Sequence, residues 1–427
     1  MKLETKVLHE GYKPKNGGPR VLPICQSTTF KYDSTEYVGQ LFDLTAPGFF
    51  YTRLANPTVD AVEQKIASLE GGVGALCTSS GQAASFLAIL NILECGDHLL
   101  SSSYIYGGTI NLFAHTFKKF GIEVTFVDQD LPLEELQKYV KENTKAVFGE
   151  TLANPALTVL DIEKFAKLAH HNDIPLIVDN TFPTPYFCRP IEFGADIVIH
   201  STTKYMDGHA LQVGGVIVDS GKFNWDNGKF LGLVEPDVTY HGISYVETFK
   251  EQAYIVKARV QLMRDLGSCP SPQNAFYLNT GLETLPIRME RHYENALAVA
   301  KFLEKQEVVE KVNYPGLENN LYRDLVQKYL PKGNCGVISF IVKGGREQAS
   351  AFIDYLKLIS LEVHVADIRT CILHPATSTH RQLDDEQLLE CGITPGLIRL
   401  SCGIEHIDDI LEDLTQAFKA IGSNYAD

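Results

Sequence analysis

The sequence predicts an α/β fold built on a mostly parallel sheet and followed by a smaller α+β domain. From residue 74 to residue 219, short apolar runs rich in β-branched residues alternate with segments of helical periodicity. That alternation is typical of βαβ crossover units. Toward the C-terminus one long helical segment precedes several strands. Because 427 residues exceed the size at which a single core stops growing, we expect two domains.

In the first of these domains the strands are expected at 74–80, 98–103, 123–128, 145–150 and 175–180, and the helices between them at 81–93, 107–120, 131–140 and 162–171. Two further apolar runs, 197–199 and 216–218, are expected to complete the sheet, and the sequence does not decide their pairing direction. Crossover helices would cover the parallel strands on both faces.

The segments on either side have a different character. Residues 1–55 are rich in Gly, Pro, Tyr and Thr and lack helical periodicity, which indicates an extended arm. A helical stretch over 246–266 is interpreted as the bridge to the second domain. That domain would hold a helix around 282–306, a final amphipathic helix, and strands in GVISFIV, LEVHVAD and LIRLSCGI. The expected parts are an arm at 1–55, a large domain at 56–255 and a small domain at 256–427.

Composition excludes several classes of function. A net charge of −15 argues against a nucleic-acid partner, because phosphate backbones require clustered Lys and Arg. No apolar run approaches the ~20 residues of a membrane span, and the first residues lack the apolar core of a secretory signal. The nine cysteines are scattered without a CxxC pair, so we expect reduced thiols of a cytoplasmic protein and no metal site.

Polar residues follow two neighbouring strands of the expected sheet. Asp179 closes one strand, and Ser201, Thr203 and Lys204 follow the next. Ligands of open α/β sheets bind at the carboxyl ends of strands. An acid, two hydroxyls and a lysine placed there suit the pyridine nitrogen, phosphate and aldehyde of pyridoxal phosphate (PLP). Each feature alone is more often a solvated turn or a cap, and it is their joint placement that favours the cofactor.

Four other segments contribute candidates of the same kind. The turn Ser79-Ser80-Gly81-Gln82 leads into a helix N-terminus, which suits a phosphate but also fits a simple cap. Tyr106 begins a YGGT turn and can stack on a planar ring or pack against a neighbouring element. Asn154 can donate to a phenolic oxygen or form an Asn-Pro turn. Arg399, in an apolar strand, needs a carboxylate, either internal or from an amino-acid substrate.

The sequence holds no GxGxxG, GxxxxGK[ST], HExxH or GxSxG motif, so dinucleotide, P-loop, zincin and α/β-hydrolase interpretations lose their main support. The motifs that it does hold are, in order, YTRLANPT, SSGQAA, YGGT, ETLANP, VDNTFPTP, HSTTKY, HPATSTH and LIRLSCGIE. Together they resemble the PLP-dependent enzymes of Cys/Met metabolism over nearly the whole chain. The resemblance implies a fold like that of aspartate aminotransferase (fold type I), with the arm contributing to the neighbouring subunit's site in a dimer of dimers.

The resemblance also implies roles for individual residues. Lys204 would form the Schiff base with the PLP aldehyde, Asp179 would pair with the ring nitrogen, and Tyr106 would stack on the ring and act as an acid. The cofactor phosphate would be bound by Ser80, Gly81, Gln82, Ser201 and Thr203, with Tyr51 and Arg53 reaching it from the neighbouring subunit. Asn154 would contact the cofactor, and Arg399 and Val365 would bind the substrate.

Within this family, the YTRLANPT wording, the 220–250 insertion and the stretch from RDLG to MERH are similar to members that add sulfide to homoserine esters. We therefore expect γ-replacement on O-acetyl-L-homoserine by sulfide, giving L-homocysteine and acetate. Gly108 stands where methionine γ-lyases carry a cysteine, and His364 where the sulfide-adding members more often have Asn. Cystathionine synthesis, γ-elimination and a non-catalytic binding protein stay open as alternatives, as do the acyl group and the sulfur donor.

Overall fold

A computed structural model describes residues 1–379, 381–382, 384–386 and 394–422. The motif residue His380 and Cys391 lie outside the described residues. The chain divides into two compact units. Unit 1 comprises Met1–Thr151 and Leu160–Thr284, and unit 2 comprises Leu152–Val159 and Leu285–Asp427. The expected domain boundaries at 55/56 and 255/256 stay a prediction. Among the helices in the described ranges, none is long and apolar enough to cross a membrane.

Unit 1 is organised around a seven-stranded sheet of order β1-β7-β6-β5-β4-β2-β3. Its strands are β1 (Gly74–Thr78), β2 (His98–Ser102), β3 (Glu123–Val127), β4 (Thr144–Glu150), β5 (Leu176–Asp179), β6 (Ile197–His200) and β7 (Gly215–Asp219). Only β7 runs against its neighbours β1 and β6. The carboxyl ends of β1, β4, β5 and β6 therefore share one edge, which confirms the predicted, mostly parallel α/β sheet.

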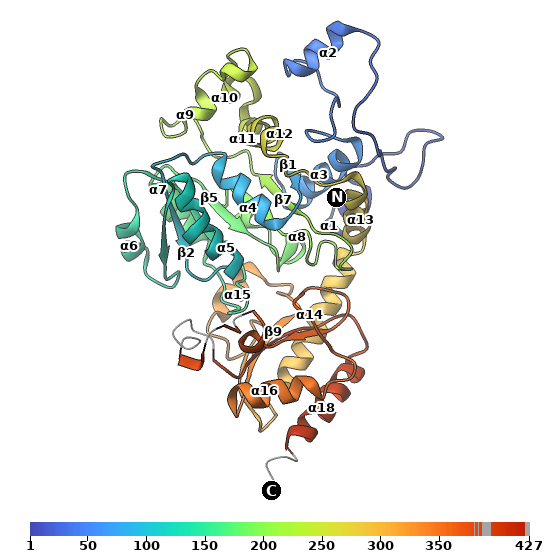
Figure 1. The fold of residues 1–427 in the computed structure, drawn as a ribbon, viewed down its shortest axis with the longest axis vertical. Coiled ribbons are helices and arrows are strands. Elements are labelled where there is room, and N and C mark those ends of the chain that lie inside the picture. The colour runs from blue at the N-terminus through green and yellow to red at the C-terminus, as the bar shows by residue number, and fades with distance from the viewer. Residues whose placement is uncertain (380, 383, 387–393, 423–427) are drawn as a thin grey trace. The chain divides into compact units, whose positions relative to one another are not determined.

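The helices of unit 1 are α1 (Leu3–His9), α2 (Thr35–Phe42), α3 (Pro57–Glu70), α4 (Gly81–Leu90), α5 (Gly107–Asn111), α6 (Leu133–Leu136), α7 (Ile162–His171), α8 (Thr184–Phe187), α9 (Leu231–Val234), α10 (Tyr245–Phe249), α11 (Ala253–Lys257), α12 (Arg264–Leu266) and α13 (Pro272–Glu283). Helices α3, α4 and α7 pack on the sheet (Figure 1). Local chemistry explains the limits of α3: Asn56 accepts a hydrogen bond from the Thr58 N–H at 2.9 Å, and Gly71 closes the helix at φ 83°.

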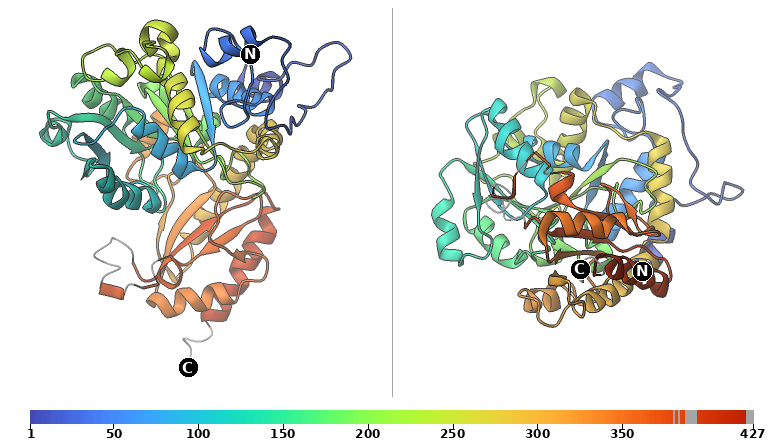
Figure 2. Two further views of the ribbon diagram at one scale, coloured as in Figure 1. Left: turned by 45° about the horizontal axis from the view of Figure 1, so that its top comes forward. Right: turned by 60° about the horizontal axis from the view of Figure 1, so that its bottom comes forward.

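Unit 2 holds a five-stranded sheet of order β10-β11-β12-β9-β8. Its strands are β8 (Val309–Asn313), β9 (Val337–Val342), β10 (Ser360–Leu361), β11 (Cys371–Leu373) and β12 (Leu397–Ser401), and its helices are α14 (Leu285–Leu303), α15 (Arg323–Tyr329), α16 (Gly345–Asp354) and α18 (Ile407–Gly422). Figures 1 and 2 show α18, in red, beside α16. Helix α18 also packs with α14, and α14 and α16 pack on the sheet.

Three local expectations were wrong. The arm is not free of helices, because α1 packs on α3 with Val7 buried and α2 is capped by Ser34. The expected helix at 131–140 shortens to Leu133–Leu136 followed by a 3₁₀ turn. In LEVHVAD only the first residue belongs to a strand, β10. The chain turns away from the sheet because Ala366 adopts φ 67° and donates its N–H to Ser401 Oγ.

Candidate active site

The core of the candidate site is a chain of contacts at the carboxyl edge of the unit 1 sheet. Asp179 ends β5, and its Oδ1 accepts hydrogen bonds from the Thr181 N–H at 3.0 Å and the Thr181 hydroxyl at 2.5 Å. The same hydroxyl oxygen accepts the Ser201 N–H at 2.9 Å. Thr181 thus joins the ends of β5 and β6, which are paired in parallel register. Sequence reasoning missed Thr181, although an Asp followed two residues later by Thr is a turn signal.

The carboxylate of Asp179 lies in surroundings that disfavour its charge. Burial raises the pKa of Asp179, while the hydrogen bond from Thr181 and the nearby His200 act in the opposite direction. A half-buried carboxylate of this kind favours a cationic partner. A protonated pyridine nitrogen is such a partner, so the position suits the ring of PLP.

The N-terminus of α4 lies directly against Ser201. A Cβ built on Gly81 would meet Ser201 Cβ at 2.6 Å and Ser201 Cα at 2.9 Å, so only glycine allows this approach. Ser80 caps the helix by accepting the Ala83 N–H at 3.0 Å. The first N–H groups of a helix have no partner within it and form an anion site together with the helix dipole. The arrangement of Ser80, Gly81 and Ser201, called the phosphate cradle below, therefore suits a phosphate group, and their binding of the cofactor phosphate stays a prediction.

Tyr106 and Gln82 are the next neighbours of this cradle. The Tyr106 N–H donates to Glu150 at the end of β4 at 2.7 Å, and the Tyr106 side chain is 47 % exposed. A Cβ on Gly108 would lie 2.5 Å from Tyr106 Cε1 and 3.2 Å from Gln82 Nε2. The absence of a side chain at Gly108 therefore lets the Tyr106 ring lie beside Gln82 at the N-terminus of α4. Stacking of this ring on a cofactor stays a prediction.

Lys204 and Thr203 lie on the turn that follows β6. The Lys204 N–H donates to the Ser201 carbonyl at 3.3 Å, and the Lys204 carbonyl accepts the Gly208 N–H at 2.8 Å. The Thr203 hydroxyl donates to the Gly214 carbonyl at 3.2 Å. This turn is fixed from both sides, and it starts at the same sheet edge as Asp179. The donor set in unit 1 (a carboxylate, a helix N-terminus with hydroxyls, and a lysine) fits PLP.

Tyr51 and Arg53 are both exposed on the arm, and the Arg53 guanidinium carbon lies 5.2 Å from the centre of the Tyr51 ring. Arg53 also approaches the loop after α12, because a Cβ on Gly267 would lie 3.8 Å from Arg53 Cδ. That loop is tied to the phosphate turn, since the Ser79 N–H donates to the Ser268 carbonyl at 2.8 Å. These contacts place the Tyr51–Arg53 pair beside the loop after α12 of its own unit.

Unit 2 brings the remaining candidates together. Arg399 on β12 donates through Nη1 to Asn154 Oδ1 at 3.4 Å and through Nη2 to the Val363 carbonyl at 3.0 Å. Val365, two residues on, is buried, and its neighbour Ala366 is held by Ser401 of the same strand β12. His364 lies in this segment, and its carbonyl accepts from the Cys371 thiol at 3.3 Å. The Arg399 guanidinium therefore contacts Asn154 and the backbone two residues before Val365.

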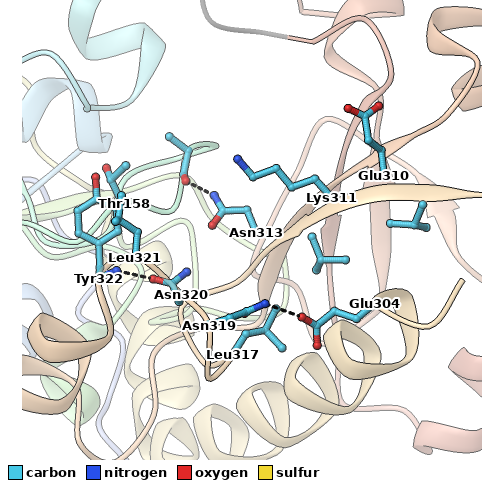
Figure 3. Close-up of a pocket in the computed structure, with 13 residues that line it drawn as sticks. Thr158, Glu304, Glu310, Lys311, Asn313, Leu317, Asn319, Asn320, Leu321 and Tyr322 are labelled. Carbon is cyan, nitrogen blue, oxygen red and sulfur yellow. Dashed lines mark hydrogen bonds between the residues drawn. The ribbon is translucent and has the colours of Figure 1, made fainter. Parts of the chain in front are cut away.

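Unit 2 also has a cavity of about 600 Å³ between β8 and the turn before α15. Some of its polar side chains are paired, as Figure 3 shows: Asn319 donates to Glu304, and Asn320 accepts the Tyr322 N–H. We assign no function to this cavity.

Comparison with known proteins agrees with this donor set. The family model of the Cys/Met metabolism PLP-dependent enzymes matches residues 4–419. The O-acetyl-L-homoserine sulfhydrylase of Leptospira meyeri is 47% identical, covering 98% of this chain and 97% of that protein. The homocysteine synthase of Schizosaccharomyces pombe is 46% identical, covering 98% of both chains.

Among solved structures, a putative O-acetylhomoserine (thiol)-lyase of Campylobacter jejuni matches with a TM-score of 0.94 at 38% identity, over 98% of this chain and 100% of that one. That crystal structure carries a pyridoxyl-lysine phosphate. The predicted fold type and cofactor are thereby confirmed. The chain belongs to the Cys/Met metabolism PLP-dependent enzyme family.

Proposed function

We propose that the protein is an O-acetyl-L-homoserine sulfhydrylase, which replaces the acetate of O-acetyl-L-homoserine with sulfide to give L-homocysteine. The observation that carries this proposal is the near-complete coverage by relatives of that activity at 46–47% identity. The reaction is a step toward methionine. We place the enzyme in the cytoplasm as a dimer of dimers, with an amino-acid ester and sulfide as its small-molecule partners.

In this proposal unit 1 holds the cofactor. Lys204 makes the covalent link to the PLP aldehyde, Asp179 pairs with the protonated ring nitrogen, and Tyr106 stacks on the ring. The phosphate is bound by Ser80, Gly81, Gln82, Ser201 and Thr203. The contact chain from Asp179 through Thr181 to Ser201 supports these roles, because it fixes the carboxylate relative to the phosphate cradle. The bound cofactor supplies an electron sink for the Cα of the amino acid.

The remaining chemistry is assigned to side chains of this protein. When the substrate amino group has displaced Lys204 from the cofactor, the freed Lys204 amine removes the proton from Cα and then one from Cβ. Tyr106 protonates the departing acetate oxygen, hydrosulfide adds at Cγ, and protons return to Cβ and Cα. Arg399 takes the substrate carboxylate, with Asn154 and the backbone at Val363 fixing the plane of its guanidinium. Val365 lines the substrate pocket, and Asn154 contacts the phenolic oxygen of the cofactor. Fixing base and substrate in this way makes the proton transfers effectively unimolecular.

Tyr51 and Arg53 are assigned to the phosphate of the neighbouring subunit. Their exposure on a segment that is fixed in place supports this assignment, because an exposed aromatic–guanidinium pair is suited to contact a partner. The arm would then complete each site of a dimer from the other chain.

A product assay tests the proposed reaction. The purified protein is given O-acetyl-L-homoserine with either sulfide or cysteine, and homocysteine, cystathionine and 2-oxo acid are measured. We expect homocysteine to be the main product when sulfide is supplied. Cystathionine as the main product, or 2-oxo acid and ammonia without sulfide, would move the protein to another reaction of the same family. Succinyl and phospho esters, run in parallel, identify the acyl group, and Lys204→Ala serves as the inactive control.

A further inference from the structure

The guanidinium of Arg259 in unit 1 connects the arm, at Leu54, to β1, the strand that leads into the turn at Ser80. Arg259 lies on the helical run after α11. Its Nη1 donates to the Leu54 carbonyl at 2.9 Å, and its Nη2 donates to Glu63 Oε2 at 2.6 Å and to the Ala75 carbonyl at 3.1 Å. Leu54 directly follows Arg53, and Ala75 belongs to β1. The predicted site did not include Arg259 or Glu63.

Glu63 completes this connection. It lies on α3, is 3 % exposed, and accepts the Cys77 N–H of β1 through its other oxygen at 2.8 Å. Three residues later β1 has given way to Ser80, the cap of α4. The two carboxylate oxygens of Glu63 and the two terminal nitrogens of Arg259 therefore contact each other or backbone atoms. Those backbone atoms lie next to the arm residues Tyr51–Arg53 or on β1, which leads to the turn at Ser80.

Stability alone is a poor explanation for such a pair. Glu63 is buried and Arg259 is half-buried, so desolvation of the two charges offsets much of their attraction. Apolar residues of similar volume often stabilise a core as well or better. Burial raises the pKa of Glu63, and Arg259 opposes that shift. What apolar residues do not supply is a planar fork with fixed donor directions. The fork fixes the Leu54 carbonyl, and thereby the exposed Tyr51 and Arg53 that immediately precede it.

We propose that Arg259, held by Glu63, is a positioning residue for the cofactor phosphate of the neighbouring subunit, acting through the Tyr51–Arg53 segment. The inference rests on the proposed function, in which this segment crosses to the neighbouring site. Arg259 itself is not predicted to contact the cofactor of its own subunit or that of the neighbouring subunit. A consequence is that the cofactor affinity of one subunit depends on a half-buried side chain of the other.

The first test uses Arg259→Lys, which keeps a cation beside Glu63 but loses the fork. The measured quantity is the PLP concentration that gives half-maximal reducible pyridoxyl-lysine after borohydride treatment. Because one or two charge-assisted hydrogen bonds are lost, we expect this concentration to rise on the order of tenfold. Arg264→Lys, five residues along the same helical run and paired with Asp265 at 2.8 Å, is the matched control and should leave it unchanged. An unchanged value for Arg259→Lys would overturn the proposal.

Mixed assemblies distinguish an effect across the interface from one within the chain. A chain with Arg259→Lys is combined with a differently tagged Lys204→Ala chain, so that the only reducible site receives its arm from a chain with intact Arg259. We expect normal PLP affinity at this site. Weak binding there would show that Arg259 acts within its own chain, contrary to the proposal. If Arg259→Lys does not fold, Glu63→Gln goes through the same assays with the same two outcomes.

A reference assembly distinguishes a failure of the crossing arm from a failure of the role assigned to Arg259. Arg53→Ala combined with Lys204→Ala should also restore normal affinity if the arm crosses the interface. Failure of this reference would contradict the crossing arm itself. Success of the reference with failure of the Arg259 assembly would contradict only the role of Arg259.

Discussion

Replacement of Gly81 by Ala tests the phosphate cradle with the smallest possible change. The new Cβ would lie 2.6 Å from Ser201 Cβ and 2.9 Å from Ser201 Cα, and the latter is a backbone atom that no side-chain rotation removes. Carbon atoms in contact normally stand about 3.5–4.0 Å apart. The N-terminus of α4 and the turn after β6 must therefore separate by about 1 Å. That separation opens the cradle between Ser80, Gly81 and Ser201.

The size of the effect follows from the cost of overpacking, about 1–3 kcal/mol in a packed region. If the strain is relieved by opening the cradle, PLP affinity falls roughly 10- to 100-fold. The gain in helix propensity from Gly to Ala, up to about 1 kcal/mol, acts on folding in the opposite direction. Cofactor affinity is thus a more sensitive readout than the free energy of unfolding, which should change little.

The assay is titration of the apo-protein with PLP, followed by its visible absorption band. Gly39→Ala in α2 is the matched control, because a Cβ there meets nothing within 4 Å. Its PLP affinity should be unchanged. A PLP affinity of Gly81→Ala equal to that of the unaltered protein would refute the phosphate cradle.

Three further outcomes are expected. Gly108→Ala should displace the Tyr106 ring and alter the visible spectrum of the bound cofactor, since the new Cβ would lie 2.5 Å from Tyr106 Cε1. Gly107→Ala is the control, because a Cβ there would meet open space, and its spectrum should not change. Equal spectra for the two variants would contradict this role of Gly108. Arg399→Lys should raise KM for the amino-acid substrate roughly 10- to 100-fold with little change in PLP affinity, because the bidentate fork is lost; a purely kcat effect would argue against carboxylate binding. Burial raises the pKa of Asp219 to about 7. Between about pH 4 and 7 the folded chain therefore keeps this proton, whereas the unfolded chain loses it. The free energy of unfolding falls over that window as the pH rises. Urea unfolding should show Asp219→Asn more stable than the unaltered protein at about pH 8, by on the order of 2 kcal/mol, with the two proteins similar in stability near pH 5. The reverse order would exclude the Asp219 carboxyl as the cause of the loss of stability at high pH.

The sequence was informative where local chemistry and strand order coincide. Asp179 and Lys204 could be placed because each follows a short apolar strand, and parallel neighbours end at one sheet edge. Ser80 and Gly81 could be placed because a cap and a glycine precede a helical segment. In the first case the order of neighbouring parallel strands determines the geometry, and in the second two adjacent residues do.

The sequence was uninformative where distant segments decide. The strand expected through His364 and Val365 fails because Ser401, far along the chain, binds the Ala366 N–H and holds a positive φ. Helix α1 forms because it finds a packing surface on α3, a contact that no local window contains. Arg259 was missed for the same reason, since its partners at Leu54 and Glu63 are about two hundred residues away.

The most direct test of the central claim is to map the cofactor chemically. The holoenzyme is treated with borohydride and digested, and the modified peptide is identified by mass spectrometry. We expect one pyridoxyl phosphate group, on Lys204, and its loss in Lys204→Ala. A modification on a different lysine, or a protein that takes up no PLP, would contradict it.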